Sequence, residues 1–189
     1  MDAFAALVDR KPATDTVILA ANPDDAPKLT KARLAVARAE TREQAARTPE
    51  AKAEAAGEVE DTRAAYDALK GDLATITFHM QGIGPHVVEE IMRAHPATKE
   101  QKATARKANN GAPGNSWNDD TFPPAMLSAC VTRIVHSDDD VADVESIDIG
   151  QATAIWRSTG LPLGDKGTLF MTALGLDQRD SGVGDLGND

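Results

Sequence analysis

The sequence has four histidines, and their spacing tells whether they could hold a metal ion. A helical zinc site places two histidines four residues apart, or combines histidine with paired cysteines. No two histidines here are four residues apart, and neither a Cys-x-x-Cys nor a His-Glu-x-x-His motif is present. We therefore expect surface or half-buried side chains, without a metal, at His79, His86, His95 and His136.

Nucleophilic catalysis lacks its usual residues as well. The one cysteine, Cys130, lies in the apolar run Ala125–Val131, which is typical of a small buried side chain. No serine stands in a Gly-x-Ser-x-Gly turn. A single cysteine excludes an internal disulfide and is typical of a reducing compartment. We predict that the chain is not an enzyme and needs no cofactor.

Two other motifs could bind phosphate or a cation but have the wrong spacing. Gly82-Ile83-Gly84 is followed by Pro85, which removes a backbone N–H, and no Lys-Ser/Thr pair follows. The run Asp138-Asp139-Asp140 lacks the alternating acids, the glycine and the glutamate of a calcium-binding EF-hand loop. We expect a turn between a strand and a helix at the first motif and a solvated acidic loop at the second.

The formal net charge of the 189 residues is −10, and most of it lies toward one end. Residues 137–189 have eleven acids and three bases, whereas residues 1–136 have nineteen acids and seventeen bases. This balance disfavours binding to nucleic acid or to an anionic membrane, which both need a basic face. No apolar run approaches the length of about 20 residues that spans a bilayer, and residues 1–10 lack the pattern of a signal peptide. The composition favours a protein partner.

The first half of the chain predicts two strands with a helical insertion between them. The β-rich run at 14–20 ends at Asn22-Pro23-Asp24-Asp25, and residues 75–80 alternate strictly between apolar and polar. Residues 28–70 are rich in Ala, Glu, Lys and Arg, which favour helix. Thr48 and Pro49 suit an N-cap and a first helical position, so we expect two antiparallel helices; one long helix kinked at Pro49 is the alternative.

The second half predicts a compact, mostly helical region. We expect a helix from Pro85 to Pro96, and further helices over 125–135, 147–158 and 163–176. The fold class is therefore mostly α (α+β), a small helical domain with a two-stranded β element and an inserted helical hairpin. The expected divisions are a segment with one strand at 1–27, the hairpin at 28–72, the compact domain at 73–176 with a flexible linker at 97–116, and a disordered acidic tail at 177–189.

Aromatic residues are only 4% of the chain, so the few large ones are candidate anchors. They could hold a small core together, or they could be contact residues for a partner, and the sequence leaves both possibilities open. The candidates are Trp117, Phe122, Pro123, Pro124, Trp156 and Phe170.

Residues 75–178 resemble the tail assembly chaperones of long-tailed, siphovirus-type phages that infect actinobacteria. The resemblance starts at the strand Ile76–Met80 and continues through Arg93–Gln101 and a polar linker. The most distinctive piece is Trp117-Asn118-Asp119-Asp120-Thr121-Phe122-Pro123-Pro124-Ala125, and two helices complete the order.

This resemblance implies a chaperone that binds the phage tape measure protein, keeps it soluble and recruits tail tube subunits. It also implies a place in the cytoplasm of the infected host and absence from the mature virion. The resemblance further implies a longer, frameshifted form of the chain as a partner. Association of the chain with copies of itself, as a homo-oligomer, is also open. A structural virion component, such as a minor tail or head–tail connector protein, is the alternative function. An enzyme with an unfamiliar site is the weakest of the three hypotheses.

Overall fold

The computed structural model describes residues 11–180, and the side chains of residues 11–176. These residues form two compact units, which we describe separately. The larger unit has residues 11–17, 78–134 and 144–180; the hairpin unit has residues 18–77 and 135–143. The expected class, mostly α (α+β), is confirmed.

The four strands are β1 (Thr14–Ala20), β2 (Thr75–Gln81), β3 (Val131–His136) and β4 (Val144–Glu145), in the order β1-β2-β3-β4. The predicted pairing of the first two strands is confirmed, and main-chain bonds extend it at both ends, from Ala21 N to Ala74 O and from Gly82 N to Ala13 O. The expectation of only two strands is wrong. β3 pairs with β4 antiparallel, with Arg133 opposite Glu145.

The expected helix at 125–135 is wrong in its second half, because the chain changes from helix to strand after Cys130. Residues 131–135, Val-Thr-Arg-Ile-Val, include four β-branched residues, and such side chains favour a strand. A backbone hydrogen bond just beyond the end of β3 joins it to β2, since Ser137 N donates to Thr75 O at 2.8 Å.

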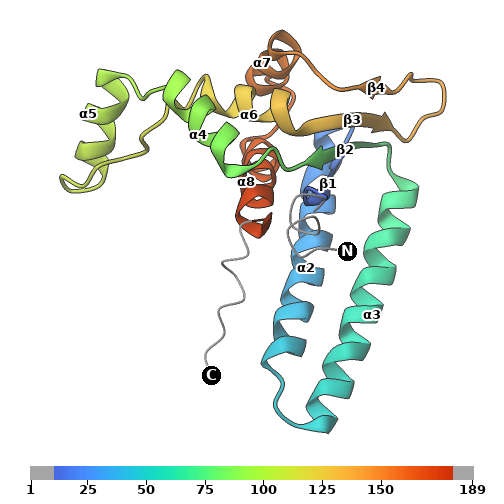
Figure 1. Cartoon of the computed structure of the whole chain (residues 1–189). Helices are drawn as coiled ribbons and strands as arrows, with labels where there is room; N and C mark the ends of the chain where they lie inside the picture. Colours follow the sequence, from blue (N-terminus) through green and yellow to red (C-terminus); the bar gives the residue numbers. More distant parts are fainter. Residues whose placement is uncertain (1–10, 181–189) are drawn as a thin grey trace, which may run out of the picture. The chain divides into compact units, whose positions relative to one another are not determined.

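The helical insertion is a hairpin of α2 (Ala26–Ala45) and α3 (Pro49–Asp72), which follow a short 3-10 turn, η1 (Pro23–Asp25). Thr48 caps α3 by accepting a bond from Ala51 N at 3.2 Å, so the expected hairpin is confirmed and the single kinked helix is wrong. Figure 1 shows the two helices side by side.

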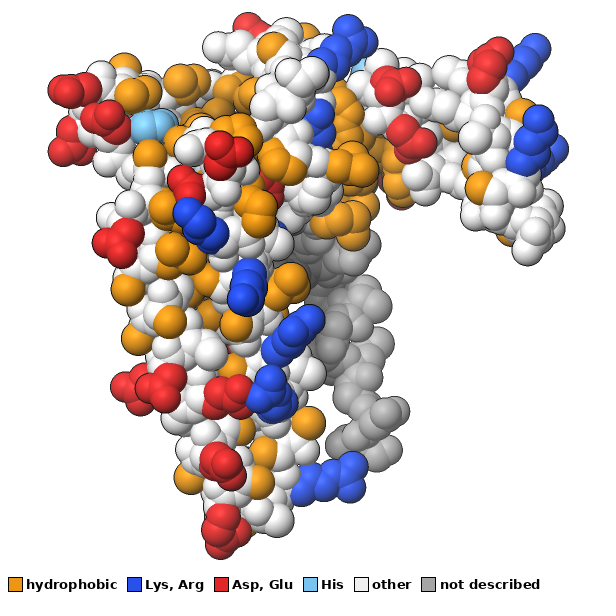
Figure 2. All heavy atoms as spheres, turned by 180° about the vertical axis from the view of Figure 1, so that it is seen from behind, with side chains coloured by type: hydrophobic (Ala, Val, Ile, Leu, Met, Phe, Trp, Pro, Cys, Tyr) orange, Lys and Arg blue, Asp and Glu red, His pale blue; other side chains and the backbone are white. Residues whose placement is uncertain are grey.

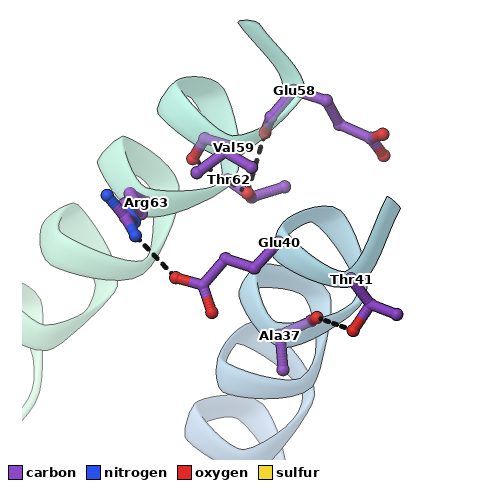
Figure 3. Close-up of polar contacts among 7 residues, drawn as sticks. All are labelled: Ala37, Glu40, Thr41, Glu58, Val59, Thr62 and Arg63. Atoms are coloured by element: carbon purple, nitrogen blue, oxygen red, sulfur yellow. Dashed lines mark hydrogen bonds and ion pairs between the residues drawn. The ribbon is translucent and has the colours of Figure 1, made fainter. Parts of the chain in front are cut away.

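Small residues fill the seam of the hairpin, where the buried side chains include Leu29, Ala39, Ala55 and Val59. Two ion pairs link the helices: Arg42 with Glu58, and Arg63 with Glu40 at 2.6 Å. Figure 3 shows the second pair. Because such a seam buries little apolar area, the hairpin gains less from packing than a seam of leucines would.

Two short helices follow β2. The expected helix after Pro85 is confirmed as α4 (Pro85–Ala94), with its buried Val88. The linker expected at 97–116 is wrong for half of its length, because α5 (Lys99–Ala108) occupies it. Thr98 and Gln101 form a capping box at its start, which satisfies two amide N–H groups and explains why a polar sequence is helical here.

The core of the larger unit is built by α6 (Phe122–Cys130), α7 (Ile149–Arg157) and α8 (Leu163–Asp180), with α7 and α8 both packed on α6. α6 supplies most of the fully buried large side chains, and α8 adds Leu169 and Leu176. The two helices expected at 147–158 and 163–176 are confirmed. The disordered tail expected at 177–189 is wrong for residues 177–180, which belong to α8; residues 181–189 lie outside the described residues, as do residues 1–10.

Candidate protein-interaction site

Four of the six predicted anchors form one aromatic cluster in the larger unit, with Phe170 at its centre. The ring centroid of Phe170 lies 6.3 Å from Trp117, 5.7 Å from Phe122 and 6.2 Å from Trp156, and Trp117 and Phe122 are 5.2 Å apart. Three of these four contacts are edge-to-face, the arrangement that the ring quadrupole favours.

The anchors differ in burial, and this separates core residues from candidate contact residues. Phe122, Pro123 and Pro124 are buried, so these three belong to the core of the unit itself. Trp117, Trp156 and Phe170 are only half-buried, so part of each ring remains at the surface. The cluster therefore has a buried base and a surface edge.

Trp117 is placed by the loop that joins α5 to α6. It pairs with Pro96 in an isolated antiparallel bridge, and the next residue, Asn118, donates its N–H to His95 O at 2.8 Å. The side chain of Asn118 accepts from Asp120 N at 2.9 Å and from the Gln101 amide at 3.3 Å. The polar residues around Trp117 thus build the turn that starts α6.

An exposed apolar flank on α8, which the sequence did not single out, continues from the cluster. Met171 is 62% exposed and Leu163 is 84% exposed, although both are large apolar side chains. Leu163, Phe170 and Leu174 recur at spacings of seven and four, so they lie along one side of α8, beside Met171. This side differs from the buried one, which carries Leu169 and Ala173. The signal was visible as a second apolar period in the helix.

The histidines and the cysteine that were considered for metal binding and catalysis do not gather into one site within the described residues. His86 lies 3.3 Å from Glu90 on α4, and His136 Nδ1 accepts from Asp138 N at 3.0 Å in the acidic loop. Cys130 is completely buried. Within residues 11–176, no three His, Cys, Asp or Glu side chains come together as a possible metal site. The pKa shifts that stand out are on the hairpin, where acidic neighbours raise the pKa of Lys28, Arg63 and Lys70.

A hollow of about 520 Å³ lies along the strands of the larger unit. It is lined by Thr14, Asp15, Thr16, His79, Met80 and Thr132. None of the six anchors lines this hollow, so it is separate from the aromatic cluster. Gly82-Ile83-Gly84, the motif that could have held phosphate, instead starts α4: Gly84 has φ 85° and its carbonyl accepts from Val87 N and Val88 N.

Comparisons of the chain with protein-family models, with curated proteins and with solved structures found no match. None of the helices that the structure describes is long and apolar enough to cross a membrane.

Proposed function

We propose that this chain is a phage tail assembly chaperone that binds the tape measure protein, keeps it soluble and helps to recruit tail tube subunits. The observation that carries the proposal is the surface edge of the aromatic cluster, where half-buried Trp117, Trp156 and Phe170 continue into the exposed Met171. We call these four residues the aromatic edge.

The aromatic edge has the side-chain chemistry that binds amphipathic helices. Such helices insert an apolar stripe into a hydrophobic surface, and tryptophan, phenylalanine and methionine are enriched where this happens. Methionine also adapts its shape to different partners. A long helical client with a repeated apolar stripe, which the resemblance implies, would present many similar segments to such a surface.

The charge of the chain supports a basic or amphipathic client. Residues 137–189 contain eleven acids and three bases, and an acidic surface attracts basic segments over roughly one Debye length, about 10 Å at 0.1 M salt. Steering of this kind raises the association rate without requiring a tight complex. A chaperone that must release its client benefits from that combination.

Co-expression with the tape measure protein from the same phage tests the proposal. We expect the chain to raise the soluble fraction of the tape measure protein and to co-purify with it. Met171→Glu should reduce both effects, because it places a charge at the aromatic edge. The matched control is Leu34→Glu, which replaces another exposed apolar residue, 49% exposed, on α2. Unchanged solubility with the wild-type chain would contradict the proposal.

Purified virions supply a second test. The proposal expects the chain in lysates of infected cells and not in mature particles, because an assembly factor leaves the finished tail. Mass spectrometry of purified particles measures this directly. Detection at a fixed copy number in each particle would instead support a structural component, such as a minor tail or head–tail connector protein.

A further inference from the structure

The two helices of the hairpin have opposite charge. α2 has five basic and two acidic residues, whereas α3 has seven acidic and three basic ones. Within one hairpin, the ion pairs Arg42–Glu58 and Arg63–Glu40 use only part of this charge. The other charged side chains lie along defined sides of α2 and α3. Their positions indicate what kind of surface the hairpin can bind.

The two ion pairs mark the opposite broad faces of the hairpin. At 100° per residue, Arg42 lies on α2 on the same side as Lys28, Lys31 and Arg38, whereas Glu40 lies on the other side. On α3, Glu58 shares its side with Glu54, Asp61 and Asp72, whereas Arg63 lies on the opposite side. One broad face therefore has a basic row on α2 beside an acidic row on α3. Figure 2 looks onto this face, where blue side chains run down α2 and red ones follow α3. We call it the charged face.

Most of the charges on this face have no partner within the described chain. Lys31, Arg38, Asp61 and Asp72 are exposed, and none of the four forms an ion pair with another described residue. Within the basic row lies the small exposed residue Ala35, which allows another helix to approach closely. An approaching surface must offer an acidic row opposite α2 and a basic row opposite α3.

A second copy of the same hairpin offers that pattern. Rotation by 180° about an axis parallel to the helices, lying on the charged face, places the α2 helix of one copy on the α3 helix of the other. The two contacts are then identical and antiparallel, as a two-fold interface requires. The rotation also preserves height along the hairpin, so residues that are level within one copy meet across the interface.

The heights match as well as the charges. Because Glu40 pairs with Arg63 and Arg42 with Glu58, Arg38 lies within about one helical turn of the level of Asp61. By the same count, Lys31 lies within about one turn of Asp72. We propose that the chain forms a homodimer in which Arg38 and Lys31 of one copy pair with Asp61 and Asp72 of the other. This inference is independent of the proposed chaperone function.

The size of the face predicts a weak dimer that depends on salt. A helix of 20 residues is about 30 Å long, and two helices side by side are about 20 Å wide, so each copy buries roughly 600 Å². The total of about 1,200 Å² is at the lower end for specific interfaces. Since the paired charges stay near solvent, salt screens their attraction, and we expect the affinity to fall at least about tenfold between roughly 20 mM and 500 mM salt.

Sedimentation velocity of the full chain over a concentration series tests the dimer. The wild-type chain should shift from monomer to dimer as its concentration rises at low salt, and should return to monomer at high salt. Two charge-reversed chains sharpen the test: Lys31→Glu with Arg38→Glu, and Asp61→Lys with Asp72→Lys. Each alone should be monomeric, because its two rows have the same sign.

The mixture of these two chains gives the decisive result. In the mixed pair, each reversed row meets a row of opposite charge, so we expect an equimolar heterodimer. The matched control for the first of these chains is Lys52→Glu with Lys102→Glu, which changes the net charge by the same amount as Lys31→Glu with Arg38→Glu but lies off the charged face, and should still dimerise. Circular dichroism of every variant should show wild-type helix content. A monomeric wild-type chain at low salt, or a failure of the mixture to associate, would overturn the proposal.

Discussion

The ring of Phe170 on α8 lies 5.7 Å from the ring of Phe122 on α6, and the ring planes are 83° apart. This edge-to-face contact joins two residues with different surroundings, because Phe122 is completely buried and Phe170 is half-buried. It connects the core of the larger unit to the aromatic edge. Substitutions at its two ends should therefore have different consequences.

Phe122→Ala should destabilise the larger unit by about 3–5 kcal/mol, because it leaves a cavity in the core. Phe170→Ala should cost less, about 1–3 kcal/mol, since water can reach part of the ring in the native state. Urea unfolding followed by tryptophan fluorescence measures both, as Trp117 and Trp156 contact Phe170. Equal losses for the two variants would contradict the assigned difference in burial.

Removal of the cap on α3 should loosen the hairpin. Thr48 Oγ1 accepts from Ala51 N at 3.2 Å, and loss of such a cap costs about 1 kcal/mol. We expect Thr48→Ala to speed amide hydrogen exchange in the first turns of α3, while Thr48→Ser keeps the bond and stays near wild type. If alanine and serine give the same exchange rates, the hydroxyl is not the cap.

Substitution of Gly84 by any other residue should destabilise the fold, because of its backbone conformation. Gly84 has φ 85°, and a side chain there is strained by about 1–2 kcal/mol even though no atom lies within 4 Å of an added Cβ. Gly167 within α8 also has open space, and there alanine should stabilise by up to about 1 kcal/mol. Urea unfolding of Gly84→Ala and Gly167→Ala should therefore give shifts of opposite sign.

Lys70 gives the hairpin a dependence on alkaline pH. Its hydrogen bond to Asp67 raises its pKa above the ordinary 10.5. A pKa that is raised on folding stabilises the native state below the ordinary value, and this contribution disappears as the pH rises through the raised value. The difference in melting temperature between the wild type and Lys70→Gln should be constant near pH 8 and shrink above 10.5. A difference that grows with pH would contradict the sign.

Local sequence signals predicted the elements whose stability comes from nearby residues. The strict alternation at 75–80 gave β2, and Thr48 with Pro49 marked the break between α2 and α3. The capping box of Thr98 and Gln101 was equally local, and recognising it would have predicted α5. The polar composition of this segment is typical of a linker, but the cap stabilises the first turn and the segment is helical.

The second half of the sheet, β3 and β4, could not be predicted in the same way. β3 begins directly after a helical residue, so it follows α6 without a turn signal, and its neighbour β4 has only two residues, too few for a typical strand signal. Their hydrogen bonds come from distant segments, as when Thr132 Oγ1 donates to His79 O. A preference for helix or strand cannot show such a partner.

The sequence by itself determined the acidic charge, the alanine-rich hairpin and the identity of the few large aromatic residues, because composition and periodicity do not depend on distant contacts. Only the tertiary structure decided which aromatics are buried. Phe122 and Phe170 are 48 positions apart and have the same side chain, yet Phe122 on α6 is completely buried and Phe170 on α8 is only half-buried. Burial depends on which helices pack together, and that packing is a property of the folded chain as a whole.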